Sequence, residues 1–304
     1  MMTRSMGATG STGPGRLPVA TGAGATRAES FLMALEDDFC DVLTKAMRGT
    51  GEGPAELAKK TGLDARAIDR WRRGRDTPSE EQARTLAVPL QLDPGKFADA
   101  ALQRWQPDPL SLGDVRHHPQ YPHPSNGYVF FLDGGKRAAL VDPAGMPANL
   151  LRILRDGAYH LEYIFITHKH ADHCDATSDV AAQFPRAKIV MHRADVHAIG
   201  SLATNALLVK DGEELPFGDV RIRLLHTPGH TDGSASYLFK STLFTGDTLF
   251  AGSVGGAYGD ASTYADILNS VRSKIFVLPD DTVLMPGHGP PSKVGWEKLH
   301  NPFF

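Results

Sequence analysis

The folds open to this chain are restricted most by one short segment, Thr167-His168-Lys169-His170-Ala171-Asp172-His173. It follows an apolar run, Tyr163–Ile166, that is typical of a buried strand. His168 and His170 stand two residues apart, so in extended backbone both side chains point the same way and can reach one ion. Buried together without a metal, such groups would incur large desolvation costs. The segment therefore predicts a metal site at the end of a strand, rather than a polar loop that is merely rich in histidine.

Three later segments repeat this design of a strand, a glycine turn and a metal-capable side chain. They are His226-Thr-Pro-Gly-His230, Phe244-Thr-Gly-Asp247 and Pro286-Gly-His288. Loops that follow strands are where α/β proteins commonly gather their sites, and imidazole and carboxylate are the usual ligands of zinc and iron. The predicted ligands are His168, His170, Asp172, His173, His230, Asp247 and His288.

From Gly127 onward, apolar runs of strand length alternate with helical patterns, which indicates a layered α/β domain. A hairpin is predicted over Asp133-Gly134-Gly135 and a helix over Tyr264–Ile275. The expected strands are Tyr128–Leu132, Ala138–Val141, Tyr163–Ile166, Lys188–Met191, Val220–Leu225, Tyr237–Phe239, Leu243–Phe244 and Val283–Met285.

The rest of the chain divides into a tail, a helical segment and a proline-rich connection. Residues 1–28 are rich in Gly, Thr, Ala and Ser, and we expect them to be disordered. Residues 29–106 show helical spacing, with a first helix predicted from Phe31 to Leu43. Prolines crowd residues 106–126, which we interpret as a linker or an irregular entry into the next domain. The expected domains are thus 1–28, 29–106 and 107–304.

Composition excludes several classes of protein. The 304 residues have a net charge of −3, which argues against nucleic-acid binding over the whole surface. The two cysteines, Cys40 and Cys174, lie far apart and suggest neither a disulfide scaffold nor a thiolate zinc site. The sequence has no apolar run near the roughly 20 residues that span a bilayer, and no secretion signal. A cytoplasmic protein is expected.

The segments THKHADH, HTPGHT, FTGDT and PGHG resemble, in order, the metal motifs of the metallo-β-lactamase superfamily, and most of all its glyoxalase II (hydroxyacylglutathione hydrolase) branch. The resemblance implies an αββα sandwich that binds two metal ions. Zinc is the expected metal, and iron is the alternative. His168, His170 and His230 would hold one ion, Asp172, His173 and His288 the other, and Asp247 would bridge them. A metal-bound hydroxide would then hydrolyse a thioester or other acyl substrate, with Asp172 as the catalytic residue that orients the nucleophile or protonates the leaving group.

The same motifs leave two other reactions open. Persulfide dioxygenases of the superfamily use one iron, which His168, His230 and Asp247 would hold here, and lactonases share the ligand set. Gly256 stands where related enzymes commonly carry an Arg, so either a substrate contact or a contact that supports the metal ligands is expected to be missing. The basic C-terminal residues that bind glutathione in longer glyoxalase II enzymes have no obvious counterpart.

Residues 56–79, from Glu56 to Ser79, resemble the helix-turn-helix domains of phage repressors, with a turn at Gly62. The resemblance implies an all-α domain that binds DNA through Arg66, Arg70 and neighbours, although such bundles also serve as dimerisation or docking modules. A different class of function, a transcription regulator with a sensor domain, follows from it. A homo-oligomer is expected. Since every predicted ligand lies beyond Thr167, the helical segment is expected to be dispensable for hydrolysis.

Overall fold

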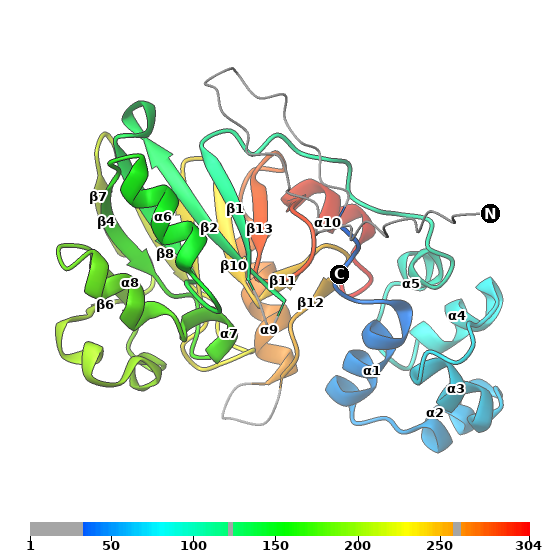
Figure 1. Ribbon diagram of the computed structural model, residues 1–304. Coiled ribbons are helices and arrows are strands. Elements are labelled where there is room, and N and C mark those ends of the chain that lie inside the picture. Colours follow the sequence, from blue (N-terminus) through cyan, green and yellow to red (C-terminus); the bar gives the residue numbers. More distant parts are fainter. Residues whose placement is uncertain (1–32, 121–123, 258–262) are drawn as a thin grey trace, which may run out of the picture.

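The computed structural model describes residues 33–120, 124–257 and 263–304 (Figure 1). The expected disordered tail, 1–28, lies outside the described residues. Two six-stranded sheets pack against each other, and a bundle of short helices lies beside them. The expected α/β sandwich is present.

The first sheet has the strand order β1-β2-β3-β4-β5-β6. Its first three strands are antiparallel, and β3 to β6 run parallel. The bounds are β1 Val115–Gln120, β2 Ser125–Leu132, β3 Arg137–Val141, β4 His160–Phe165, β5 Lys188–His192 and β6 Leu207–Val209. The predicted hairpin is confirmed, because residues 133–135 form the 3₁₀ turn η1 between β2 and β3.

The second sheet has the order β14-β13-β10-β9-β8-β7, and its one parallel pair is β10 with β13. Its strands are β7 Glu214–Phe217, β8 Val220–His226, β9 Ala235–Phe239, β10 Thr242–Gly246, β13 Val283–Pro286 and β14 Ser292–Lys293. A small hairpin of β11, Leu249–Phe250, and β12, Ser253–Val254, follows β10.

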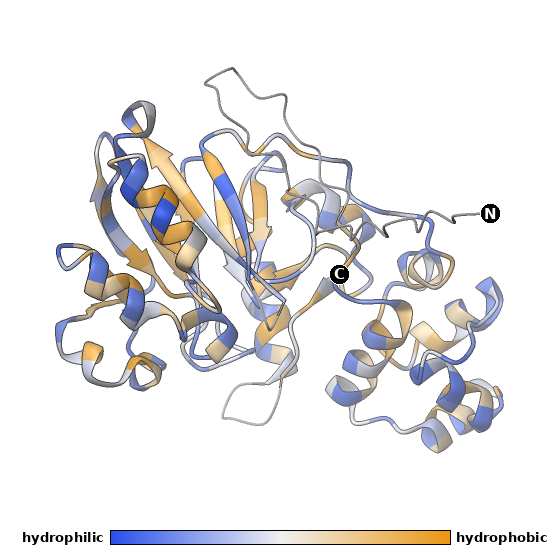
Figure 2. Cartoon of the chain, in the orientation of Figure 1, coloured by the Kyte–Doolittle hydropathy of each residue, from blue (hydrophilic) through white to orange (hydrophobic). Residues whose placement is uncertain are grey.

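Helices cover much of the outer side of each sheet, while alternate residues of β7 and β8 stay exposed (Figure 2). Successive side chains of a strand point to opposite faces. Tyr128 and Phe130 of β2 therefore enter the core between the sheets, and Val129 packs on the outer side. That outer side carries α6 Ala148–Asp156, α7 Ala171–Cys174, α8 Thr177–Gln183 and the 3₁₀ segment η2 Val196–Asn205. The second sheet carries α9 Tyr264–Ser270, its π-helical continuation η3 Val271–Ile275, and α10 Val294–His300.

The helical segment forms five helices: α1 Phe39–Thr50, α2 Pro54–Thr61, α3 Ala65–Arg72, α4 Glu80–Ala87 and α5 Pro94–Ala101. Phe31 and Leu32 of the predicted first helix lie outside the described residues, and residues 33–38 are not helical, so α1 begins later than predicted, at Phe39. Asp38 is the N-cap of α1. The Asp38 backbone N–H donates a hydrogen bond to Asp41 Oδ2 at 3.1 Å. Described residues before Asp38 instead run along the sandwich, where the Asp37 carboxylate accepts from the Ser253 hydroxyl.

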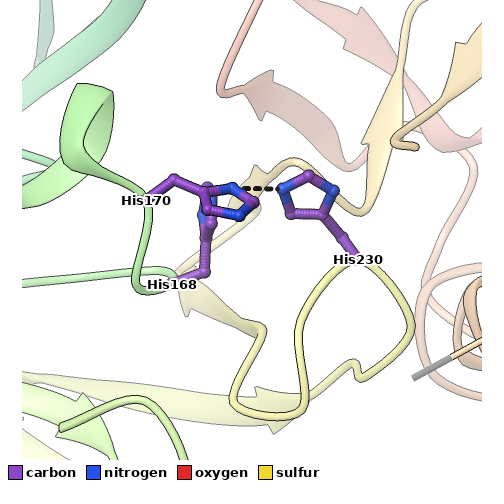
Figure 3. A group of neighbouring side chains, drawn as sticks. All are labelled: His168, His170 and His230. Carbon is purple, nitrogen blue, oxygen red and sulfur yellow. Dashed lines mark hydrogen bonds between the residues drawn. The ribbon is translucent and has the colours of Figure 1, made fainter. Parts of the chain in front are cut away.

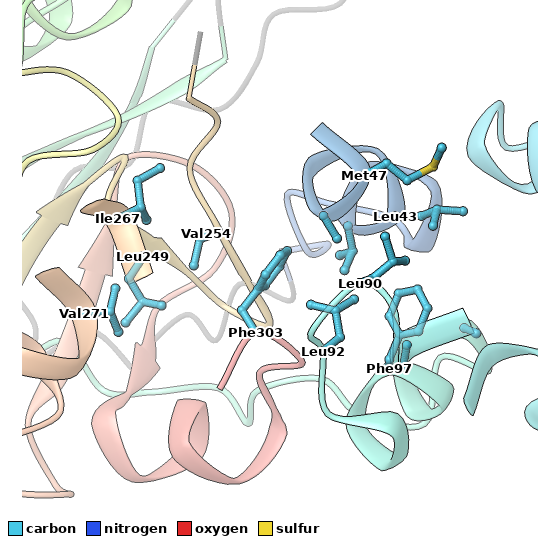
Figure 4. Close-up of a cluster of buried hydrophobic side chains, with 14 of the residues drawn as sticks. Leu43, Met47, Leu90, Leu92, Phe97, Leu249, Val254, Ile267, Val271 and Phe303 are labelled. Atoms are coloured by element: carbon cyan, nitrogen blue, oxygen red, sulfur yellow. The ribbon is translucent and has the colours of Figure 1, made fainter. Parts of the chain in front are cut away.

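The bundle and the sandwich share one hydrophobic core (Figure 4). Phe303 is 1% exposed and lies between Leu92 of the bundle and Val254 of the sandwich. Hydrogen bonds reinforce the contact: the Asp93 N–H donates to the Pro302 carbonyl at 2.8 Å. The two parts are therefore packed as one body rather than joined by a loose linker.

The predicted linker also contains a strand that the sequence pattern did not reveal. Residues 115–120 form β1 at the edge of the first sheet. Pro119 lies within it, and an edge strand tolerates proline because one side of its backbone has no partner strand. Proline content alone thus did not reveal that this segment contributes an edge strand to the first sheet.

Phe303→Ala tests the shared core. Removing a buried aromatic ring costs about 3–5 kcal/mol, and the loss should lower the stability of bundle and sandwich together. Denaturant unfolding followed by Trp fluorescence and by circular dichroism should show one common transition at lower denaturant. Leu299→Ala, at a side chain 66% exposed, is the matched control. Two separate transitions in the wild-type chain would contradict the shared core.

Glu297 gives the fold a pH dependence. It is fully buried, and its Oε2 accepts from the Gly252 N–H and the Asn301 amide at 2.9 Å each. Burial raises the pKa of Glu297 from 4.5 to about 7, against the hydrogen bonds from Ser292 and Asn301 that lower it. The folded state therefore binds the proton more tightly than the unfolded state.

The contribution of Glu297 to the free energy of unfolding is complete below pH 4.5 and is lost as the pH rises through about 7. Between these pH values the free energy of unfolding of the Glu297→Gln variant should fall by up to about 3 kcal/mol less than that of the wild type. We would compare the free energies of unfolding of metal-free wild type and variant at pH 4.5 and pH 8, so that other groups cancel. Parallel pH profiles would show that Glu297 does not titrate in this range.

Candidate metal centre

The seven predicted ligands meet where the two sheets open at one end. His168 and His170 follow β4, while Asp172 and His173 lie in α7 directly after them. His230, Asp247 and His288 lie on the loops after β8, β10 and β13. All seven side chains that the sequence singled out are brought together.

The first group contains three imidazoles (Figure 3). His168 and His170 come from one loop and His230 from the loop opposite. His170 Nδ1 lies 3.0 Å from His168 Nε2 and 2.8 Å from His230 Nε2. Burial lowers the pKa of His168 far below its ordinary value, and the neighbouring His173 and His230 lower it further. Neutral nitrogens that face one another in this way present lone pairs to one cation.

The second group contains Asp172, His173 and His288. His288 Nε2 lies 3.3 Å from His173 Nε2 and 3.4 Å from Asp172 Oδ2. Burial alone would raise the pKa of Asp172, but its contacts with His288 and His173 lower it well below its ordinary value. The carboxylate therefore stays ionised, as a metal ligand requires.

Asp247 lies between the two groups. Its Oδ1 is 3.4 Å from His173 Nε2, and its Oδ2 is 3.4 Å from His230 Nε2 and 3.6 Å from His288 Nε2. Oδ1 is buried and has no hydrogen-bond partner among the residues that the structure describes. A buried carboxylate oxygen without a partner is costly unless a cation compensates it. The donor set thus fits metal ions, with one carboxylate in reach of both positions.

Asp142, which the sequence analysis missed, supports this arrangement from below. It is buried directly after β3, and its carboxylate accepts from the Thr167 N–H and hydroxyl at 2.7 Å each. The same carboxylate lies 3.0 Å from His173 Nδ1, so it fixes the ring with Nε2 toward Asp247. An Asp at the end of a predicted strand was the available signal. Asp195 acts similarly, since it accepts from the Lys169 and Gly233 N–H groups.

Two glycines allow the close approach of the ligand loops. A Cβ on Gly287 would stand 2.2 Å from Asp247 Oδ1. Gly246 has φ +49°, and a Cβ there would meet the Thr167 hydroxyl at 2.5 Å. The glycine turns in the sequence are therefore required by the space around Asp247.

Comparisons with known proteins place this arrangement in a family. The model of the metallo-beta-lactamase superfamily matches residues 122–288. The chain belongs to the metallo-β-lactamase superfamily. Hydroxyacylglutathione hydrolase GloC of Haemophilus influenzae is 29% identical over 188 residues, which cover 56% of this chain and 89% of GloC. Membership of this superfamily, together with similarity to hydroxyacylglutathione hydrolases, indicates a metal-dependent hydrolase.

Two solved structures of the superfamily have a similar fold. ETHE1 from Myxococcus xanthus is 27% identical, with a TM-score of 0.54 over 62% of this chain and 83% of ETHE1. The protein TTHA1623, solved in a di-iron-bound form, is 26% identical, with a TM-score of 0.55 over 62% of this chain and all of that one. Both similarities leave more than a third of this chain unmatched.

The helix-turn-helix resemblance receives no support from these comparisons, so DNA binding and a regulatory role stay predictions. Arg66 and Arg70 are exposed on α3, as the resemblance requires. However, Asp69 pairs with Arg72 and Arg73, and Arg70 lies 3.7 Å from Asp76. Part of the basic charge of α3 is thus compensated within the bundle.

A cavity of about 360 Å³ leads to the metal ligands and is lined in part by the bundle. His170, Asp172, His230, Asp247 and His288 form one side of it. The other side carries residues of α1 and of the segment before it: Glu36, Asp37, Asp41, Thr44, Lys45 and Arg48. A bundle that lines the cavity does not agree with our expectation that it is dispensable for hydrolysis.

Within residues 33–120, 124–257 and 263–304, no helix combines the length and the apolar character that a bilayer crossing needs.

Asp142→Asn tests the support of the centre. An amide cannot accept all three hydrogen bonds that the carboxylate receives, so His173 loses its fixed orientation. We expect metal affinity to fall about 10–100-fold while the fold is retained. Zinc titration against a competing chelator measures the affinity and circular dichroism the fold. Asp179→Asn, at an exposed position of α8, is the matched control. Unchanged affinity in Asp142→Asn would contradict its role.

Proposed function

We propose that this chain is a dinuclear zinc hydrolase of thioesters, with a hydroxyacylglutathione-like substrate. The observation that carries the proposal is the position of Asp247, in reach of both ligand groups. His168, His170 and His230 would hold one ion, and Asp172, His173 and His288 the other. The name of the relative GloC supports the substrate class.

Zinc ions bound here would act as Lewis acids and lower the pKa of bound water. The protein residues have separate tasks in that reaction. Asp247 compensates charge at both positions, and Asp142 keeps His173 oriented. Asp172 is 28% exposed in its side chain and lines the cavity, so its ionised carboxylate can accept a hydrogen bond from the attacking water and orient it.

The test combines metal content with the reaction. Protein expressed without added metal should bind two equivalents of zinc and release free thiol from S-lactoylglutathione. His170→Ala should lose one of the two equivalents and nearly all hydrolysis, because the first ion would keep only His168 and His230. His197→Ala, an exposed histidine outside the centre, is the control.

One result would overturn the proposal. A single tightly bound iron, together with oxygen consumption on glutathione persulfide that survives in His170→Ala, would assign the dioxygenase reaction. If the protein hydrolyses lactones and does not hydrolyse the thioester, the proposed metal centre stands and the proposed substrate class is wrong.

A further inference from the structure

The outer ring nitrogens of the ligand histidines, which face away from the metal centre, have partners of their own. In His168 the outer nitrogen, Nδ1, lies 3.0 Å from the Thr167 hydroxyl, and in His230 it lies 2.6 Å from the Gly256 carbonyl. In His173 it faces the buried carboxylate described above. These partners belong to the sandwich. A hydrogen bond at the outer nitrogen fixes the ring and strengthens its inner nitrogen as a ligand.

The outer nitrogen of His288 faces the segment that leads into helix α1. The inner nitrogen, Nε2, lies 3.4 Å from Asp172 Oδ2 and 3.6 Å from Asp247 Oδ2. Nδ1 lies 3.8 Å from Oε1 of Glu36, which is ion-pair distance. Because the Glu36 side chain is flexible and 39% exposed, a small rotation brings its carboxylate to hydrogen-bond distance.

The backbone of this segment is held close to the loop after β13. Gly289 of that loop has φ +71°, and a Cβ on it would stand 2.9 Å from the Glu36 nitrogen. On the other side, Asp37 pairs with Lys45 of α1 and accepts from the Ser253 hydroxyl. Contacts on both sides therefore limit how far Glu36 can move from the ligand that follows β13.

Helix α1 is itself fixed by its apolar face. Leu43 and Met47 are buried in the core that the bundle shares with the sandwich. On another side of the helix, Lys45 donates to the Val254 carbonyl at 2.7 Å. Rotation of α1 would expose the apolar side chains and break this hydrogen bond, so the packing of the helix also sets the position of the segment before it.

Glu36 differs from the other acidic residues that line this wall of the cavity. Asp37 pairs with Lys45, and Asp41 accepts from the Asp38 N–H. Glu36 lines the same cavity but faces an imidazole of the metal centre. Its carboxylate is therefore placed to support that imidazole.

A carboxylate at this position also improves the charge balance of the centre. Each zinc ion carries two positive charges, whereas Asp172 and Asp247 are the acidic side chains among the seven predicted ligands. The attraction between opposite charges grows as their distance falls. Glu36 should therefore stabilise an ion beside His288 more than an ion beside His170.

We propose that Glu36 is a positioning residue for the ion that Asp172, His173 and His288 would hold. Its carboxylate accepts a hydrogen bond from the Nδ1–H of His288 and keeps Nε2 of that ring directed at the ion. The proposal rests on the dinuclear centre of the function proposed above. Glu36 lies outside residues 122–288, so its contact is additional to the part of the chain that the superfamily model matches.

The experiment measures stepwise zinc binding to the full-length protein by titration against a competing chelator. Glu36→Ala should weaken one of the two equivalents about 10–100-fold and leave the other unchanged, because a ligand histidine loses its outer partner. Glu36→Gln should fall between wild type and Glu36→Ala, since its amide oxygen still accepts from Nδ1–H but carries no charge. In a His170→Ala background, which should retain only the ion beside His288, Glu36→Ala should weaken the remaining equivalent.

Glu81→Ala, the same change at an exposed residue of α4 outside the cavity, is the matched control and should bind both equivalents as wild type does. Circular dichroism should show an unchanged fold in every variant. Equal weakening of both equivalents by Glu36→Ala, or of neither, would overturn the role of Glu36 and leave the dinuclear hydrolase standing. A wild type that binds a single equivalent would reject the dinuclear function instead. In that case, weaker binding of this equivalent by Glu36→Ala, partly restored in Glu36→Gln, supports the role of Glu36, and unchanged binding rejects it.

Discussion

The structure depends on one electrostatic constraint: seven ionisable side chains converge at the ends of four strands, and several of them are buried. Without cations, facing imidazole nitrogens and the buried oxygen of Asp247 would oppose folding. The rest of the sandwich holds these side chains close together. Parallel strands bring the loops to one edge, glycines let the loops approach, and Asp142 and Asp195 bind the backbone and side chains that hold the ligands.

The sequence indicated which side chains come together because these residues lie in short motifs, each directly after an apolar run. His168 and His173 could be assigned to a site without knowing how the sheets pair. Asp142 could not be found in this way, because it is a single Asp after a strand, and only the pairing of β3 with β4 brings it beside Thr167. Support residues of this kind are recognised from contacts between distant segments.

Predictions about the fold failed where tertiary contacts override local pattern. The apolar spacing at Phe31 and Leu35 favoured a helix, yet the cap at Asp38 starts α1 later and leaves Asp37 to contact the sandwich. The prolines of residues 106–126 indicated a linker, yet β1 pairs with β2 through six residues of it. The bundle was interpreted as an accessory domain because its own pattern carries no sign of the surface against which it packs.

The two faces of α1 give one helix two duties that cannot change independently. Leu43 and Met47 are buried in the core shared with the sandwich, and on the other side of the helix Thr44 and Arg48 line the cavity. A substitution deep in the bundle, far from the metal ligands, would shift the helix by a fraction of an ångström and move the guanidinium with it. The shape of the cavity can therefore change through substitutions in the hydrophobic interior, while the ligand motifs stay constant.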